Sequence, residues 1–310
     1  MINFHNGKEL PNRFAGSELK KTLLYEGKEY LVKFPDPTRK KALEISYINN
    51  TFSEYIGSKI FESAGIPVQN VLLGTYLSDS NKEKIVCACE DFTSSNERLV
   101  EFNNMAISNI EAEYQMTTDI HLIEESIYAN KFLSEPVHII EKFWNMFIID
   151  ALIGNVDRHN SNWGFLENMQ THELTMAPVY DCGSSLFSLD SDMQLGILLS
   201  DDEQFRNRAY NVYSCLKENG KRIQYAAFME EMKHEHCNKA MMRMLPYIDM
   251  QEINTIVNET EFLSEQRKAF YNKVLEFRYE KILLPVYKKL LCIEKENKKE
   301  TTKEEMKRRI

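Results

Sequence analysis

The stretch Gly154-Asn155-Val156-Asp157-Arg158-His159-Asn160-Ser161-Asn162, followed later by Asp181-Cys182-Gly183, decides the fold class of this chain. An Asp, an Asn soon after it and a second Asp before a Gly supply, in order, the residues that phosphoryl transfer requires. The first Asp can orient an attacking hydroxyl, whereas the Asn amide oxygen and the second carboxylate can hold Mg²⁺ against nucleotide phosphates. We therefore interpret Asp157 as the catalytic residue and Asn162 and Asp181 as metal ligands. The sequence predicts a kinase.

The residues around this motif predict how its parts come together. Apolar residues at helical spacing before the motif predict a buried helix, which Gly154 and Asn155 end. Residues 163–166 and 174–180 predict two strands with a polar turn between them, and this hairpin would bring Asn162 and Asp181 together. Taken singly, the motif's Asp and Asn side chains would be read as ordinary loop residues. Their combination with the Asp-Cys-Gly unit favours the metal site.

The motif, the phrase Ala177-Pro178-Val179-Tyr180-Asp181 and the N-terminal half together resemble the HipA-like serine/threonine kinases, in particular the small CtkA-type bacterial members. The resemblance extends from about residue 14 to 186 and more loosely to about 290. It implies ATP and Mg²⁺ as cofactors, a Ser/Thr hydroxyl of a protein as the acceptor, and autophosphorylation. It is also compatible with a separately encoded antitoxin-type partner. The Asp-Arg-His-x-x-Asn run is similar to phosphoinositide kinases as well, so a phosphoinositide or small-molecule kinase stays open, as does a nucleotide-binding pseudokinase.

A kinase also needs a lysine that reaches the phosphates and a loop that covers them. Residues 23–34 predict a β-hairpin whose second strand carries Lys33, and the resemblance assigns this lysine to the nucleotide phosphates. On its own, Lys33 would be read as a surface strand lysine. Residues 13–22 resemble the family's phosphate loop, which implies that Gly16 and Ser17 contact phosphate. This segment has one glycine and departs from the glycine-rich loop of ordinary protein kinases.

The acidic partner of the lysine and the hinge are expected next along the chain. Apolar spacing predicts a helix over about residues 41–64, on which Glu54 is the family-matching partner of Lys33. Two strands, 68–77 and 85–89, then lead to Glu90-Asp91-Phe92. We interpret this segment, which begins at Glu90, as the hinge between lobes, where backbone groups would bond adenine while Phe92 packs nearby. An ordinary loop is the alternative.

These elements predict an α+β, two-lobed, protein-kinase-like fold. The expected parts are a β-rich N-lobe (1–90), a larger helical C-lobe (91–292) and a charged tail (293–310). Helical patterning dominates from about residue 97 onward, and serines within 183–202 occupy the place of an activation segment. His234-Glu235-His236-Cys237 is the one metal-like cluster, and we interpret it as a solvated helix face because alternate residues of a helix point apart.

Composition agrees with this interpretation. The chain has 310 residues, 43% of them hydrophobic and 27% charged, as in ordinary globular proteins. The net charge of −9 disfavours nucleic acid as a ligand, because DNA affinity depends on cationic contacts. No apolar stretch approaches the length of a membrane span, and no signal peptide is evident. The six scattered cysteines predict reduced thiols, so we expect a cytoplasmic protein, with export as an effector left open.

Overall fold

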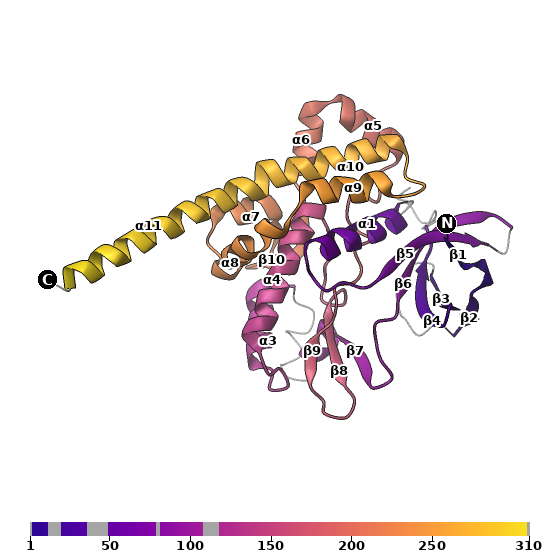
Figure 1. The fold of residues 1–310 in the computed structure, drawn as a ribbon, viewed down its shortest axis with the longest axis horizontal. Coiled ribbons are helices and arrows are strands. Elements are labelled where there is room, and N and C mark those ends of the chain that lie inside the picture. The colour runs from indigo at the N-terminus through magenta and orange to yellow at the C-terminus, as the bar shows by residue number, and fades with distance from the viewer. Residues whose placement is uncertain (1, 12–19, 36–48, 79–80, 108–117, 309–310) are drawn as a thin grey trace.

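The computed structural model describes residues 2–11, 20–35, 49–78, 81–107 and 118–308. The predicted phosphate-loop residues Gly16 and Ser17, and the first part of the predicted helix 41–64, lie outside the described residues. A β-rich lobe at the N-terminal end faces a larger lobe made mostly of helices (Figure 1). The α+β class expected from the sequence is therefore confirmed.

The small lobe is built on a six-stranded sheet with the strand order β1-β5-β6-β4-β3-β2. Its strands are β1 (Ile2–Asn3), β2 (Lys8–Leu10), β3 (Lys20–Tyr25), β4 (Lys28–Lys33), β5 (Val71–Leu77) and β6 (Glu83–Glu90). A short 3-10 turn, η1 (Phe4–Asn6), follows β1. The tight turn Glu26-Gly27 has positive φ at both residues, as two-residue hairpins prefer, and it joins β3 to β4. The predicted hairpin therefore exists, with Lys33 as the last residue of β4.

Helix α1 (Asn50–Ser63) connects the two lobes. It packs on β5 and β6 on one side and on helices α4 and α9 on the other. Its apolar residues Phe52, Ile56 and Ile60 belong to the large core of the helical lobe, whereas the outer face of the sheet has a small core of its own. Because α1 lies between the lobes, a side chain in its middle can reach the space between them.

The centre of the large lobe is α4 (Pro136–Ile153), which is buried on nearly all sides. Gly154 ends it in the left-handed conformation at φ 68°, as the sequence predicted. Beside it lies a three-stranded antiparallel sheet with the order β7-β8-β9, formed by β7 (Glu97–Glu101), β8 (Gly164–Asn168) and β9 (Leu174–Met176). The expected hairpin is present, although β9 ends well before residue 180 because Pro178 has no N–H for a sheet ladder. The expectation of mostly helix from residue 97 was wrong for β7, which pairs with β8.

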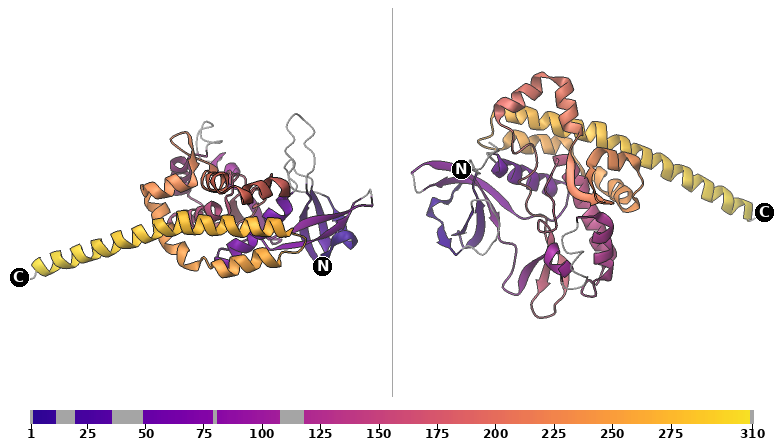
Figure 2. Two further views of the ribbon diagram at one scale, coloured as in Figure 1. Left: turned by 90° about the horizontal axis from the view of Figure 1, so that it is seen from above. Right: turned by 180° about the vertical axis from the view of Figure 1, so that it is seen from behind.

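A second departure from the predicted helical pattern is the hairpin of β10 (Tyr213–Glu218) and β11 (Lys221–Gln224). Its turn is Asn219-Gly220, with φ of 51° and 78°. An Asn-Gly pair is a strong hairpin signal, but the sequence interpretation gave more weight to the helical periodicity of this region. The remaining helical elements are α2 (Phe102–Ile107), α3 (Ile120–Ala129), α5 (Asp192–Ser200), α6 (Asp202–Tyr210), α7 (Tyr225–Glu231), α8 (Glu235–Met244), η3 (Leu245–Tyr247), α9 (Met250–Glu259), α10 (Glu265–Arg278), η4 (Tyr279–Leu283) and α11 (Leu284–Arg308). The C-terminal part of α11 projects away from the body of the protein (Figure 2). Among the described helices, none has the length and apolar character needed to cross a bilayer.

Candidate active site

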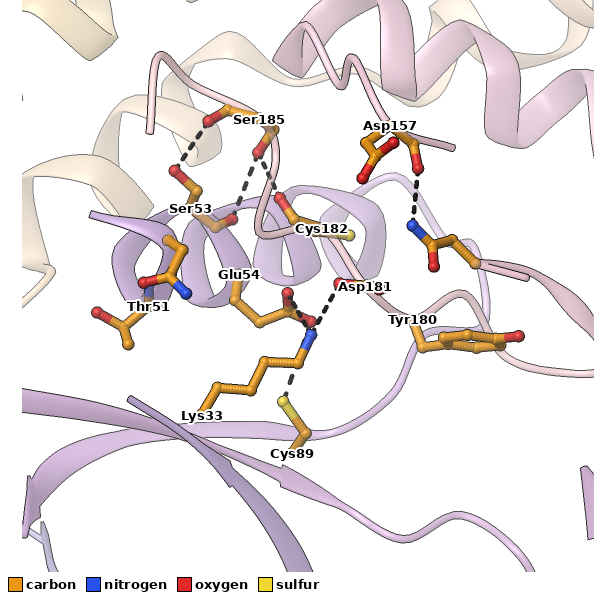
Figure 3. A network of polar contacts seen from close by, with 12 residues as sticks. Lys33, Thr51, Ser53, Glu54, Cys89, Asp157, Tyr180, Asp181, Cys182 and Ser185 are labelled. Carbon is orange, nitrogen blue, oxygen red and sulfur yellow. Dashed lines mark hydrogen bonds and ion pairs between the residues drawn. The ribbon is translucent and has the colours of Figure 1, made fainter. Parts of the chain in front are cut away.

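Three charged side chains from distant parts of the sequence meet between the lobes. Lys33 at the end of β4 places its Nζ 3.0 Å from Glu54 Oε2 on α1 and 2.8 Å from Asp181 Oδ1 (Figure 3). Lys33 is 8% exposed and Glu54 is fully buried. Buried charges are stable only when they are paired and hydrogen-bonded, so this ion pair fixes the position of the lysine relative to α1. Glu54, the helix residue that the resemblance indicated as the partner of Lys33, is in contact with it.

The Asp181 segment approaches α1 closely because residues there are small. Gly57 of α1 lies against Cys182, where an added Cβ would come within 2.8 Å of the Cys182 Cβ. Any larger residue at position 57 would push the Asp-Cys-Gly unit away from the helix and so away from Glu54. Burial raises the pKa of the Cys182 thiol to about 12, so this residue is a packed neutral thiol.

Charge interactions keep Asp181 ionised. Burial favours the neutral carboxyl, but the nearby Lys33 ammonium outweighs it and lowers the pKa of Asp181. Asp181 adopts a left-handed backbone conformation with φ 60°, which is unusual for a residue other than glycine. Strained residues of this kind cluster at functional sites, where the surrounding structure holds them in place.

The loop that carries Asp157 is anchored on a buried ion pair. Arg158, only 1% exposed, donates to both carboxylate oxygens of Asp150 on α4, at 2.9 and 3.1 Å. The same guanidinium donates to the backbone carbonyls of Asn162, at 2.8 Å, and of Tyr180. One side chain therefore joins α4, the end of the Asp157 loop and the residue before Asp181.

The side chain of Asn162 is oriented by a hydrogen bond to Asp157, the catalytic candidate of the same motif. Its Nδ2 donates to the backbone carbonyl of Asp157 at 2.7 Å. Because only the amide nitrogen can donate to a carbonyl, this bond determines which side of the amide carries the oxygen. The Asn162 amide and the Asp181 carboxylate both supply oxygen donors, which is the chemistry that Mg²⁺ prefers. The residues present therefore fit the metal that the motif predicted.

Asp157 lies at the edge of this site with a half-exposed side chain (51%). Partial burial raises the pKa of its carboxyl, an effect that nearby His159 opposes and the charge of Asp181 reinforces. A raised pKa makes the carboxylate a better proton acceptor, as general base catalysis requires. The backbone N–H of Asp157 donates to Asn155 Oδ1 at 3.1 Å, so the loop conformation is also fixed from the end of α4.

The predicted hinge residues differ in what their backbones can offer to a ligand. Glu90 donates its N–H to the Asn70 carbonyl and accepts from Gln69 Nε2 at its own carbonyl, both at 2.9 Å. Its carboxylate is engaged by Lys28. Phe92, in contrast, has no backbone hydrogen bond to the described residues, and its ring lies 5.9 Å from that of Tyr180. The structure thus leaves Phe92 better placed than Glu90 to bind an adenine base through its main chain.

A cavity of about 440 Å³ opens beside Asp157. Its walls include Ser184 from the segment after Asp181, and Cys215 and Arg222 from the β10–β11 hairpin. Arg222 is a site residue that the sequence interpretation missed; the Asn219-Gly220 turn would have revealed its hairpin, although not its neighbours. Of the serines in the expected activation segment, Ser185 is fully buried and donates to the Cys182 carbonyl at 2.7 Å. Ser184 is half-buried and faces the cavity.

Comparison with known proteins places this geometry in a family. The model of the HipA-like C-terminal domain matches residues 14–258. Serine/threonine-protein kinase CtkA of Helicobacter pylori is 40% identical over 275 residues, which are 87% of this chain and 82% of that protein. The crystal structure of the Helicobacter pylori proinflammatory kinase CtkA matches with a TM-score of 0.83 at 35% identity, and the match covers 94% of this chain and 99% of that chain. The expected two-lobed kinase fold is therefore confirmed.

A more distant likeness concerns the fold alone. A chain from the complex of HipA, HipB and operator DNA of Shewanella oneidensis MR-1 matches with a TM-score of 0.52 at 14% identity. It covers 90% of this chain and 68% of that chain.

Proposed function

Because the chain belongs to the HipA-like C-terminal domain family, we propose that it is a serine/threonine protein kinase that uses ATP and Mg²⁺. The observation that carries the proposal is the position of Lys33, which contacts both Glu54 and Asp181 between the two lobes. A lysine held by a helix glutamate next to a metal-binding aspartate is the arrangement that active protein kinases require. The 40% identical relative is itself named a serine/threonine-protein kinase.

Each residue of the site takes a role in this proposal. Lys33 binds nucleotide phosphates and Glu54 holds it in place, while backbone groups at Phe92 bind adenine. Asn162 and Asp181 would hold Mg²⁺, which neutralises phosphate charge when bound. Gly16 and Ser17 stay predicted phosphate contacts, since they lie outside the described residues.

Asp157 orients the acceptor hydroxyl and takes its proton. The cavity beside it gives the acceptor segment access to this carboxylate, and its wall includes the half-buried Ser184 of the chain's own activation-segment region. Autophosphorylation is part of the proposal for this reason. A separate protein substrate is expected as well, whereas an antitoxin-type partner stays a prediction from the resemblance, because the likeness to HipA supports the fold alone.

The test is incubation of the purified protein with γ-labelled ATP and Mg²⁺, with a generic protein acceptor and mass spectrometry. We expect phosphoserine or phosphothreonine with the wild type, and a rate lower by about 2–4 orders of magnitude for Asp157→Asn, the usual effect of losing a general base. Nucleotide affinity by calorimetry should change little. Asp202→Asn is the matched control, since this exposed aspartate bonds to Lys273 on the surface.

Two results would contradict the proposal. Full turnover by Asp157→Asn would remove Asp157 from the mechanism. Tight Mg²⁺-dependent ATP binding without any phosphoprotein would point to a phosphoinositide or small-molecule kinase, or to a pseudokinase that acts as an interaction module.

A further inference from the structure

A second cluster of ligand-type side chains lies in the helical lobe, away from the cleft. Glu124 on α3 faces His234 and His236 at the start of α8. His236 Nδ1 lies 2.9 Å from Glu124 Oε1, and His234 Nε2 lies 3.7 Å from the same oxygen. The interpretation of this histidine pair as a solvated helix face was wrong. His234 is the N-cap residue of α8, with extended backbone angles (φ −94°, ψ 110°), so helical spacing does not separate the two imidazoles.

The separations within this cluster match those around one small ion. Zn²⁺ binds nitrogen and carboxylate oxygen at about 2.0–2.2 Å, so two ligand atoms at a tetrahedral angle lie roughly 3.3 Å apart. The two distances to Glu124 Oε1, 2.9 and 3.7 Å, lie on either side of that value. All three ligand atoms lie within 4.8 Å of one another. Small movements of the side chains would bring them around a single cation.

One ring nitrogen of His234, Nε2, faces Glu124 and is available to a ligand. Its side chain is only 12% exposed, and its buried Nδ1 has no hydrogen-bond partner among the described residues. Its Nε2 points toward Glu124 but is too distant, at 3.7 Å, for a hydrogen bond. A cation between this nitrogen and Glu124 would engage Nε2 as a ligand, while the proton of the neutral imidazole would sit on Nδ1.

Neighbouring groups already support the carboxylate as a ligand. Trp144 Nε1 donates to Glu124 Oε1 at 2.7 Å, and the Trp144 ring packs on His234 with centroids 4.3 Å apart. Metal-binding carboxylates commonly accept such an outer hydrogen bond, which fixes their orientation. Trp144 lies ten residues before Gly154 on α4, so this cluster is about 15 Å along the helix axis from the end that carries the catalytic loop.

We propose that Glu124, His234 and His236 form a binding site for a divalent transition-metal ion, with Zn²⁺ as the preferred occupant and water in the fourth position. Two imidazoles and one carboxylate favour Zn²⁺ over Mg²⁺ or Ca²⁺, which require mostly oxygen ligands. The half-exposed His236 leaves the site a path to solvent. This proposal is independent of the kinase assignment.

The ion would act as a clamp within the helical lobe. It would tie α3 to α8, which otherwise meet at this point through hydrogen bonds and ring contacts. The first turn of α3 is attached in turn to the β10–β11 hairpin, where the Gly220 N–H donates to Asp119 Oδ2 at 3.1 Å. The same hairpin carries Arg222 in the wall of the cavity beside Asp157. Metal binding would therefore stabilise the elements that support this wall.

The test uses the full-length protein, stripped with a chelator and kept in millimolar Mg²⁺ so that hard-oxygen sites are occupied. Zn²⁺ is titrated by calorimetry while tryptophan fluorescence is recorded, because Trp144 contacts two of the three ligands. We expect one equivalent of Zn²⁺, a fluorescence change that saturates with it, and an absorption spectrum of four-coordinate Co²⁺ when cobalt replaces zinc. At 100 times the dissociation constant, the unfolding temperature should rise by about 3–8 °C.

Variants distinguish this site from adventitious binding. Glu124→Gln retains an acceptor for Trp144 and so preserves the fold. Loss of a residue that only hydrogen-bonds to a metal ligand weakens metal binding by about 10–100-fold, and loss of the ligand Glu124 itself should weaken Zn²⁺ binding by more than that. His236→Ala should abolish the cobalt spectrum. His138→Ala, a change at an exposed histidine elsewhere, should have no effect. Absence of stoichiometric binding to the wild type, or binding that Glu124→Gln and His236→Ala leave unchanged, would overturn the proposal.

Discussion

Replacing Arg158 with Met tests whether one buried cation holds the catalytic loop together. The guanidinium pairs with both oxygens of Asp150 and donates to the carbonyls of Asn162 and Tyr180. The Met side chain has a similar length and can occupy the apolar space, but it replaces none of these bonds. We therefore expect Arg158→Met to affect both stability and turnover, for separable reasons.

The effect on stability follows from what remains buried. Without Arg158, the buried Asp150 carboxylate still accepts a hydrogen bond from Asn155 Nδ2 at 2.9 Å, the remaining side-chain donor to it among the described residues. Breaking a buried ion pair by removing one partner costs about 3–5 kcal/mol, because it leaves a charge without compensation. In a protein of this size, such a loss lowers the unfolding temperature by about 5–8 °C. This is a large share of the ~5–15 kcal/mol by which folded proteins are stable.

A second substitution separates the two effects. Asp150→Asn, added to Arg158→Met, removes the unpaired charge and leaves an amide that can still accept from Asn155. We expect the double variant to recover about 2–3 kcal/mol relative to Arg158→Met, because removing both partners of a buried pair costs less than removing one. Turnover should not recover, since the links to the Asn162 and Tyr180 carbonyls remain broken. Urea denaturation and labelled-ATP assays on the wild type, both single variants and the double variant measure the two quantities.

The control is another buried arginine. Arg267 is 1% exposed and bonds to Asp192 and to the Asp190 carbonyl, on elements that do not carry the candidate catalytic residues. Arg267→Met should lower stability while turnover per folded molecule is kept. A double variant no more stable than Arg158→Met would refute the ion-pair explanation. Recovery of turnover together with stability would mean that Arg158 acts through Asp150 alone.

Three further predictions concern the same site. Gly154→Ala places a Cβ at φ 68° against the guanidinium of Arg278 and should destabilise the protein by about 1–3 kcal/mol in urea denaturation; an unchanged midpoint would contradict this. Asp157 must be ionised to accept a proton, and its pKa is raised. The value of kcat/KM should therefore increase with pH through an acidic limb whose midpoint lies above the ordinary aspartate pKa of about 3.9. A midpoint at or below that value would argue against Asp157 as the base. Glu54→Gln weakens the hold on Lys33 and should raise KM for ATP and lower kcat, whereas unchanged kinetics would exclude the pair from catalysis.

The parts of the site that sequence could predict are those built from local patterns. Buried-helix spacing followed by Gly154 located the end of α4, and turn residues located the hairpin that brings Asp181 beside the Asp157 loop. Strand alternation around a two-residue turn located β4 and therefore Lys33. These signals are strong because each depends on residues only a few positions apart.

Contacts between distant segments gave no such signal. The role of Arg158 depends on Asp150 and on the Tyr180 carbonyl, which reach it only after α4 and β9 are placed. Arg222 lines the cavity because the β10–β11 hairpin places it there. The Asn-Gly turn of this hairpin is a local sequence signal, but the two strands are short, and the helical periodicity of the residues around them favoured a helix in the sequence interpretation.

The histidine cluster shows why the same residues can be interpreted in opposite ways. Alternate residues diverge on a helix but not at its N-cap, where the backbone is extended, and His234 occupies that position. The boundary of α8 therefore decides whether the two imidazoles converge, and boundaries are the least certain part of a prediction from local pattern. The third ligand, Glu124, comes from a helix more than a hundred residues earlier and has no local signal at all. A binding site assembled from a helix cap and a remote carboxylate is thus visible only once the tertiary structure is known.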